Sequence, residues 1–187
     1  MLVEKKERVI MGIDPGTSVM GYGVILEKGS KIELIAMGIV QMDHLEDHFL
    51  KLQRIFSKTI GLVDEYKPDV VALEAPFYGK NIQVMLKLGR AQGIAMAAAL
   101  SRDIPIMEYA PRKIKQSITG NGSAGKEQVA AMLQRLLNFK ETPEFLDATD
   151  GLAVAVCHSF QRVGTSSSGK SYSGWTAFAK DNQKRLK

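Results

Sequence analysis

The chain has 187 residues, of which 45% are hydrophobic and 24% are charged, a composition typical of one packed globular domain rather than of a disordered chain. Its apolar runs are short, and the longest, residues 93–100, excludes a membrane segment because a bilayer is crossed by roughly 18–20 apolar residues. A formal net charge of +5 favours a polyanionic partner, while the single cysteine, Cys157, excludes an internal disulfide and predicts core packing in a cytoplasmic protein.

Strands dominate the first part of the chain. Apolar runs with alternating positions, separated by the turn signals at Gly16 and residues 27–30, predict three antiparallel strands over residues 8–14, 19–26 and 31–42. Apolar residues at helical spacing then predict a helix over 47–66, which Pro68 stops. The short unbroken run VVALE, residues 70–74, is typical of a central parallel strand, and we expect it beside the first strand.

Helices dominate the second part. The pattern predicts a helix over 81–100, a fifth strand over 104–109, and two further helices over 127–137 and 146–162. The predicted fold is therefore α/β, with a mixed five-stranded sheet flanked by helices in one domain over residues 1–163. Residues 164–187 are rich in Ser, Gly and Lys without a sustained period, and they predict a flexible C-terminal tail.

Two carboxylates are expected at neighbouring strand ends. Asp14 follows the first strand and precedes Pro15-Gly16, a setting that ordinary turn chemistry also explains. Glu74 ends an otherwise apolar run, where a carboxylate is costly unless it is paired, solvated or bound to a metal. If the two strands are parallel neighbours, both side chains lie at their carboxyl ends, where α/β sheets place functional sites.

Asp147 and Asp150 stand three residues apart at the start of the last predicted helix and project from one face. Helix capping alone would explain them. Brought together with the two strand carboxylates, however, they would repel one another unless a cation compensated them. Oxygen ligands of this kind suit Mg²⁺ or Mn²⁺, and two such ions about 3.5–4 Å apart support in-line attack at a phosphodiester.

Two glycine-rich segments are similar to nucleotide-binding loops. Residues 164–171, GTSSSGKS, match the P-loop pattern, but no buried strand leads into them and no helix receives a phosphate, so we reject this interpretation. Residues 120–126, GNGSAGK, continue with Glu127 instead of Ser or Thr. This second segment is better suited to binding nucleic acid than to binding a nucleotide.

Over residues 8–162 the chain resembles the bacterial crossover junction endodeoxyribonuclease family RuvC. Five segments resemble family motifs: GIDPGTSVMGYGV, LEAPFYGKN, LKLGRAQGIAMAAAL, IKQSITGNGSAGKEQV and DATDGLAVAVCH. The resemblance implies an RNase H-like fold, a homodimer, divalent-metal cleavage of four-way junction DNA in recombination and repair, and cooperation with RuvA and RuvB. It differs at Ala75-Pro76, where some members carry Gln-Val, and residues 164–187 match no motif.

The resemblance also implies roles for individual residues. By position, the four family carboxylates correspond to Asp14, Glu74, Asp147 and Asp150. Phe77 falls at the family's aromatic residue near the crossover, where a ring could stack on an unpaired base. The basic residues would bind phosphates of the DNA backbone. Lys115 and Lys126 would lie near the phosphate that is cut, and flanking phosphates would be bound by Lys80, Lys87, Arg90, Arg112 and Lys113.

A small-residue stripe in the helix at 81–100 also bears on dimerisation. Gly89, Gly93 and Ala97 recur every four residues and would let two helices approach closely, although the same face could pack on its own sheet. A twofold dimer would suit two symmetric cuts in a junction.

Two other functions are compatible with parts of the sequence. DPGTSVMGYG is also similar to the first phosphate loop of actin-like ATPases and sugar kinases, but these enzymes need two lobes and the length offers one. A module that binds junction DNA without cutting it would use the same basic residues. Such a module gains nothing from four carboxylates beside phosphates, so the sequence favours cleavage.

Overall fold

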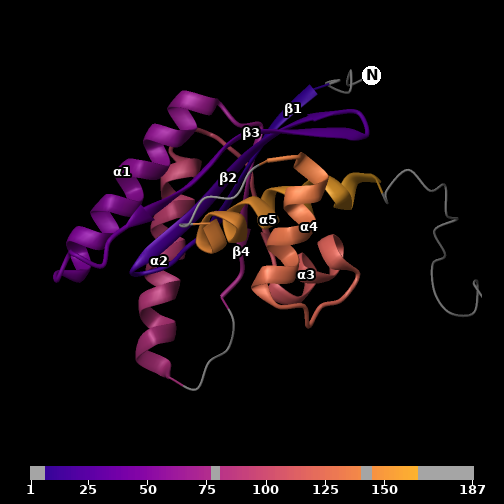
Figure 1. The fold of residues 1–187 in the computed structure, drawn as a ribbon. Coiled ribbons are helices and arrows are strands. Elements are labelled where there is room, and N and C mark those ends of the chain that lie inside the picture. The colour runs from indigo at the N-terminus through magenta and orange to yellow at the C-terminus, as the bar shows by residue number, and fades with distance from the viewer. Residues whose placement is uncertain (1–6, 77–80, 140–144, 164–187) are drawn as a thin grey trace, which may run out of the picture.

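The computed structural model describes residues 7–76, 81–139 and 145–163. Its centre is one five-stranded sheet (Figure 1) whose strands are β1 (Glu7–Asp14), β2 (Val19–Lys28), β3 (Lys31–Gln41), β4 (Val70–Glu74) and β5 (Ile106–Tyr109). The order across the sheet is β3-β2-β1-β4-β5. The first three strands pair antiparallel, whereas β4 is parallel to both β1 and β5, which confirms the mixed five-stranded sheet.

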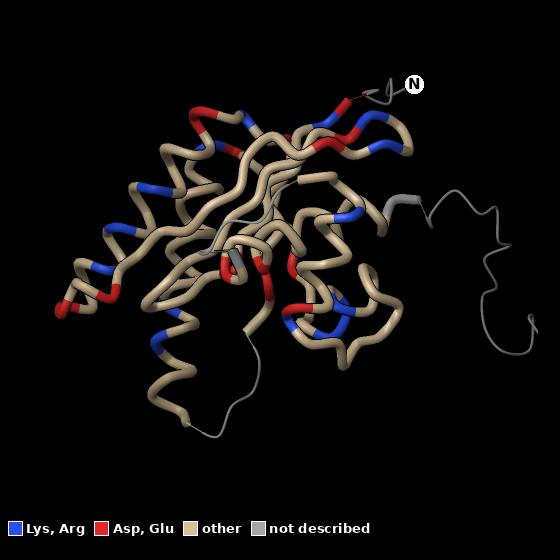
Figure 2. The backbone as a smooth tube through the Cα atoms, in the orientation of Figure 1, with Lys and Arg blue, Asp and Glu red and all other residues tan. Residues whose placement is uncertain are grey.

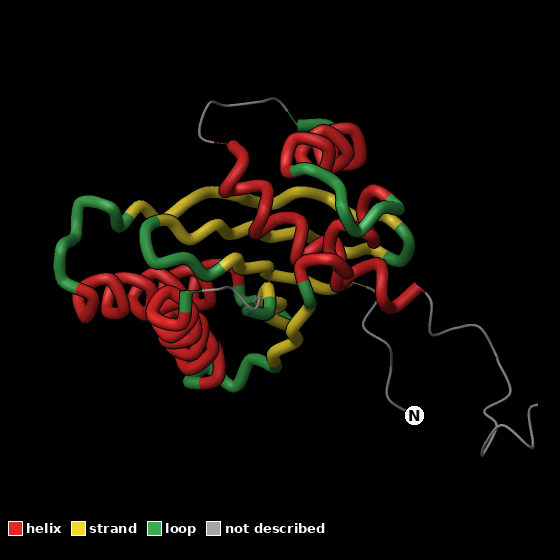
Figure 3. The backbone as a smooth tube through the Cα atoms, turned by 90° about the horizontal axis from the view of Figure 1, so that it is seen from below, coloured by secondary structure: helices red, strands yellow, loops and turns green. Residues whose placement is uncertain are grey.

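Helices cover both faces of the sheet, as Figure 3 shows from below. Their bounds are α1 (His48–Tyr66), α2 (Ile82–Leu100), α3 (Pro111–Thr119), α4 (Lys126–Leu137) and α5 (Phe145–Val163). One apolar core joins the sheet to α1 and α2, and a second joins its other face to α3, α4 and α5. Cys157 is fully buried in the second core, as expected.

The helix α3 was not predicted. The sequence predicts no helix between the fifth strand and residue 127, where Pro111 and the glycines at 120, 122 and 125 interrupt the pattern. Proline is, however, favoured in the first turn of a helix, where its missing N–H costs no hydrogen bond. Ile114 and Ile118, four residues apart, are both buried and hold the helix against the core. The prediction of two helices after β5 was therefore wrong, since the described residues hold three there.

Helix starts differ from the prediction by one residue where a capping side chain precedes the helix. Asp47 accepts hydrogen bonds from the N–H groups of Phe49 and Leu50, and Asn81 accepts one from Val84. Both residues have extended backbone and lie just outside α1 and α2. Among the helices of the described residues, none combines the length and apolar character needed to cross a bilayer.

Several predicted features lie outside the described residues. These are the C-terminal tail at 164–187 with its P-loop match, and two of the predicted DNA-binding residues, Phe77 and Lys80. The division into a domain over residues 1–163 and a tail stays a prediction.

Candidate active site

Asp14 and Glu74 come together because β1 and β4 are parallel neighbours. The register pairs Ile13 with Leu73, so each strand places its next residue, a carboxylate, at the same edge of the sheet. The residues before them, from Ile10 to Ile13 and from Val70 to Leu73, include no exposed side chain. The two carboxylates therefore stand where buried strands leave the core, as the sequence predicted.

The start of α5 reaches this edge because glycines let its backbone touch β1 and β2. A Cβ on Gly12 would lie 2.2 Å from the Gly151 carbonyl oxygen, and one on Gly21 would lie 1.9 Å from the Asp147 carbonyl oxygen. The helix contributes a glycine of its own, since a Cβ on Gly151 would come within 2.5 Å of Tyr22. No side chain larger than hydrogen fits at these positions.

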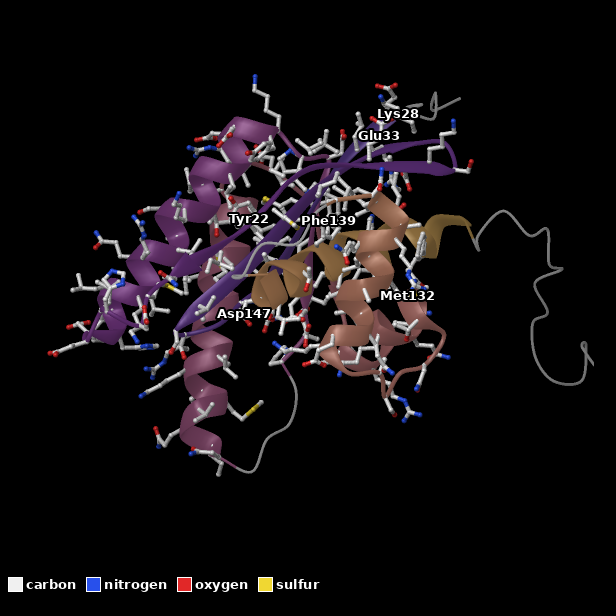
Figure 4. The ribbon with its side chains drawn as sticks, in the orientation of Figure 1. Tyr22, Lys28, Glu33, Met132, Phe139 and Asp147 are labelled. Carbon is white, nitrogen blue, oxygen red and sulfur yellow. The ribbon has the colours of Figure 1, made fainter. Side chains whose placement is uncertain are left out.

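This contact carries Asp147 and Asp150 to the strand ends. Figure 4 places Asp147 at the beginning of α5, at the opposite end of the sheet from Lys28 and Glu33. Figure 2 shows acidic positions gathered where β4 ends and α5 begins, beside basic positions on α3 and at the start of α4. Asp147 is half exposed, with 51% of its side chain accessible, whereas Asp150 is at 16%.

Lys126, the first residue of α4, makes direct contact with this acidic group. Its ammonium donates a hydrogen bond to Oδ2 of Asp150 and lies 3.5 Å from Oδ1 of Asp147. Burial works against the charge of Lys126, but the hydrogen bond to Asp150 and the surrounding carboxylates raise its pKa above the ordinary value. The lysine is therefore held as a cation.

The buried carboxyls hold their protons unusually tightly. Burial, followed by the charges of Asp150 and Asp147, raises the pKa of Asp14 to about 6, although Lys126 opposes the rise. Burial, followed by the charges of Asp14 and Asp150, raises the pKa of Glu74 to about 7. Burial also raises the pKa of Asp150 against the opposing effect of Lys126. One ammonium thus does not fully compensate the group.

These four residues suit a hard divalent cation by their chemistry. They offer only carboxylate oxygens, and the raised pKa values mark a deficit of positive charge that a divalent ion would remove. Within the described ranges, no three histidine, cysteine or acidic side chains already converge at metal-ligand spacing. Asp150 is instead engaged by Lys126.

A cleft of about 600 Å³ opens beside Asp14 and Glu74. Its other walls come from the strand exits and from α2, and include Pro15, Pro76, Val84, Met85, Leu88 and Gln92. The buried Gln92 amide donates to Oε1 of Glu108 at 2.6 Å and to the Glu74 carbonyl oxygen at 3.4 Å. Helix α2 is thus tied directly to the end of β4.

The predicted DNA-binding residues that the structure describes fall into two groups. Lys115 and Lys126 lie near the carboxylates, and the charge of Lys115 lowers the pKa of both Glu74 and Asp150. Arg112 and Lys113 on α3, and Lys87 and Arg90 on α2, are exposed and make no hydrogen bond to the four carboxylates within the described structure. The structure thus brings two of the basic residues into the site and leaves these four on its approaches.

Comparison with known proteins identifies the family. Residues 10–158 match the family described as Crossover junction endodeoxyribonuclease RuvC. The chain is 58% identical to a protein of that description from Christiangramia forsetii, over 99% of this chain and 96% of the relative. The chain belongs to the RuvC family. A RuvC relative from Bacteroides fragilis is 57% identical, with all of both chains covered.

Solved RuvC structures share the fold. The RuvC of T. thermophilus in complex with a Holliday junction substrate aligns with a TM-score of 0.77 and 34% identity, covering 84% of this chain and 97% of that one. The yeast mitochondrial Holliday junction resolvase Ydc2 aligns with a TM-score of 0.60 over 82% of this chain. At 14% identity, this second likeness concerns the fold alone. The fold is RNase H-like, as the resemblance implied.

Sequence reasoning predicted the four carboxylates but missed the residues that position two of them. Gly12, Gly21 and Gly23 are isolated glycines in predicted strands, a pattern that signals close approach of another backbone. A Cβ on Gly23 would lie 2.4 Å from Cα of Leu152 in α5. This signal was available in the sequence. The hydrogen bond from Gln92 to the end of β4 has no comparable pattern in the sequence, because a single glutamine in a helix is usually solvated.

Proposed function

We propose that this chain cuts Holliday junctions with Asp14, Glu74, Asp147 and Asp150 as its catalytic, metal-holding residues. Its activity class follows from its family: it is a crossover junction endodeoxyribonuclease, a divalent-metal-dependent nuclease. One observation carries the assignment of residues, the meeting of two strand-end carboxylates with the acidic start of α5. The raised pKa values of Asp14 and Glu74 support it, because such perturbation clusters at functional sites.

The metal that we propose is Mg²⁺, with Mn²⁺ as a substitute and two ions at each site. Carboxylate oxygens are the ligands that these ions prefer. When bound, such ions lower the pKa of the attacking water and neutralise charge on the phosphate and the leaving 3′ oxygen. The chain's own task is to hold the ions: Asp14 and Glu74 from rigid strand ends, and Asp147 and Asp150 from α5.

The basic residues would hold the substrate. The exposed cations on α2 and α3 flank the carboxylates, and we assign them to phosphates of the junction arms. Lys115 and Lys126 lie close enough to the carboxylates to bind the phosphate that is cut. We keep Phe77 and Lys80, which lie outside the described residues, as proposed DNA contacts.

We propose a homodimer that meets through α2. Gly89, Gly93 and Ala97 are exposed, and a Cβ on either glycine would meet no atom within 4 Å. The stripe therefore does not pack on its own sheet, the alternative that the sequence left open. Two symmetric subunits would place two sites on strands of like polarity, as paired nicks require. RuvA and RuvB stay proposed partners.

The test is cleavage of an end-labelled four-way junction beside a linear duplex, with Mg²⁺ or EDTA. We expect paired, symmetric nicks on the junction alone, dependent on metal and lost in Asp14→Asn while junction binding survives. Asp64→Asn is the matched control, since Asp64 is exposed on α1 and pairs with Arg102. A junction that is bound but never cut, over several crossover sequences, would instead support a binding module.

A further inference from the structure

Lys126 reaches a carboxylate that is otherwise largely shielded from water. The Asp150 side chain is 16% exposed and the Lys126 side chain 52%, so the ammonium approaches Asp150 from the solvent side. The same ammonium lies 3.5 Å from Asp147, which makes it a bridge between the two acidic residues of α5. A charge-assisted hydrogen bond of this kind is among the stronger polar contacts in proteins.

The backbone beneath Lys126 is well anchored. The Gly125 N–H donates to Oε1 of Gln128 at 3.0 Å, and the Val129 N–H donates to the Gly125 carbonyl oxygen at 3.2 Å. Just upstream, the Asn121 side chain accepts from the Ser123 N–H at 3.0 Å. The ammonium can therefore leave Asp150 by rotation of its own flexible four-carbon stem, without movement of α4.

A divalent ion and this ammonium compete for the same oxygens. Two cations that share one carboxylate lie a few ångströms apart and repel, most strongly where water is largely excluded. We propose that Lys126 is the resident counter-ion of the site, which binds Asp150 in the absence of metal and must release it when a divalent ion binds. This inference rests on the proposed function, because it takes Asp150 as a metal ligand.

The exchange has a consequence for the substrate. Once displaced, the ammonium turns towards solvent, where a DNA phosphate is its next available anion. A metal that frees Lys126 therefore strengthens junction binding, and by linkage the junction strengthens metal binding. In this way Lys126 positions the phosphate only after the carboxylates have received their ion.

The test is Mn²⁺ binding to the full-length protein without DNA, followed by electron paramagnetic resonance of the free ion. We expect Lys126→Gln to bind Mn²⁺ several-fold tighter than the unaltered protein, up to about tenfold, which corresponds to about 1.4 kcal/mol. Lys126→Arg keeps the charge and the contact, so its affinity stays at the level of the unaltered protein or below it. Urea unfolding of each variant establishes that it is folded.

Lys115→Gln is the matched control. Lys115 acts on Glu74 and Asp150 through its charge, but within the described residues its side chain makes no ion pair with them. We expect its Mn²⁺ affinity to rise by less than about twofold. An equal increase of Mn²⁺ affinity in Lys115→Gln and Lys126→Gln would show that only the overall charge matters. That result would overturn the inference but would leave the proposed metal site in place.

Two further measurements complete the test. The side-chain amine resonance of Lys126, assigned by its loss in Lys126→Gln, should be protected in EDTA and disappear as Mg²⁺ saturates the protein. A resonance unchanged at saturation would overturn the exchange. Asp14→Asn should weaken Mn²⁺ binding, and if it did not, both the proposed metal site and this inference would fall.

Discussion

At the scale of single residues, Asp14 and Glu74 exchange protons near neutral pH. Their pKa values are raised to about 6 and about 7 because burial and neighbouring carboxylates penalise the charged forms. Only the deprotonated carboxylate binds a divalent ion well. At the proposed metal site, protons and metal would therefore compete for these two side chains.

This competition predicts a pH dependence for cleavage. At limiting Mg²⁺, we expect the rate to rise as pH passes the pKa of Asp14, about 6, and to level off only once pH exceeds that of Glu74, about 7. A tenfold increase in Mg²⁺ should move the midpoint to lower pH. Single-turnover cleavage measures both effects, and a midpoint near the ordinary carboxyl range at every metal concentration would contradict them.

The same pKa shifts predict an effect on stability. Because the pKa of Asp14 is raised from 3.8 to about 6, the folded state holds the proton more tightly than the unfolded state. The stabilisation that comes from this tighter proton binding is complete when the pH is below the pKa of Asp14 in the unfolded state. It is lost as the pH rises through the pKa of Asp14 in the folded state. Without metal, Asp14→Asn should thus raise the free energy of unfolding at pH 8 by about 1–3 kcal/mol.

Urea unfolding in EDTA measures this difference. Near pH 4, where Asp14 is protonated in the folded protein, the advantage of Asp14→Asn should vanish. Added Mg²⁺ should stabilise the unaltered protein and leave the variant nearly unchanged, since an ion that binds only the folded state shifts the equilibrium by its occupancy. A variant that is less stable than the original at pH 8 would contradict the account.

At the scale of elements, the contact between α5 and the antiparallel strands decides where two carboxylates stand. Gly21→Ala would place a Cβ 1.9 Å from the Asp147 carbonyl oxygen. Overpacking of this kind costs about 1–3 kcal/mol and moves the backbone. We expect a loss of stability in urea unfolding and, in the protein that remains folded, weaker Mg²⁺ binding and slower cleavage.

Gly61→Ala is the control for this substitution. Gly61 lies in α1, and a Cβ there would meet no atom within 4 Å. Removing a mid-helix glycine should raise stability by about 0.5–1 kcal/mol and leave cleavage unchanged. If Gly21→Ala behaved like Gly61→Ala, the close backbone contact would not be what positions Asp147.

The elements also separate what the sequence could predict from what it could not. All five strands and the neighbouring positions of Asp14 and Glu74 followed from apolar patterning, because β1 and β4 are buried runs that each end in a carboxylate. Helix α3 was missed because its proline and nearby glycines are equally typical of a loop. The contact of Lys126 with Asp150 joins residues 24 apart across two helices, and no local pattern encodes such a pairing.

At the scale of the whole molecule, the exposed stripe on α2 predicts the assembly. Gly93→Leu would fill a face that is open in this chain, so the monomer should fold normally while close approach of two α2 helices is blocked. We expect sedimentation to show monomers and junction cleavage to yield single, uncoordinated nicks. Gly61→Leu, at another open glycine position, should leave both assembly and paired nicking intact, and a dimeric Gly93→Leu would place the interface elsewhere.

The stripe and the site share a helix, which ties assembly to chemistry. Gln92 lies beside Gly93 and donates a hydrogen bond to the backbone at Glu74. A partner that packs on α2 would therefore press on the helix that is hydrogen-bonded to the strand end carrying Glu74, a proposed catalytic carboxylate. Both features belong to the same rigid element, so loss of the dimer is expected to slow cleavage at each site as well as to uncouple the two cuts.

The contribution of α5 also has a consequence for the order in which the protein is made. The strands that carry Asp14 and Glu74 leave the ribosome early, but the helix that packs on the glycines of β1 and β2 is the last helix of the described fold. Until α5 emerges, the face of the sheet on which it packs lacks the helix that contributes more core residues there than any other element, and the acidic site lacks Asp147 and Asp150. A nascent chain of this nuclease is therefore expected to stay inactive until α5 has emerged and packed on the sheet.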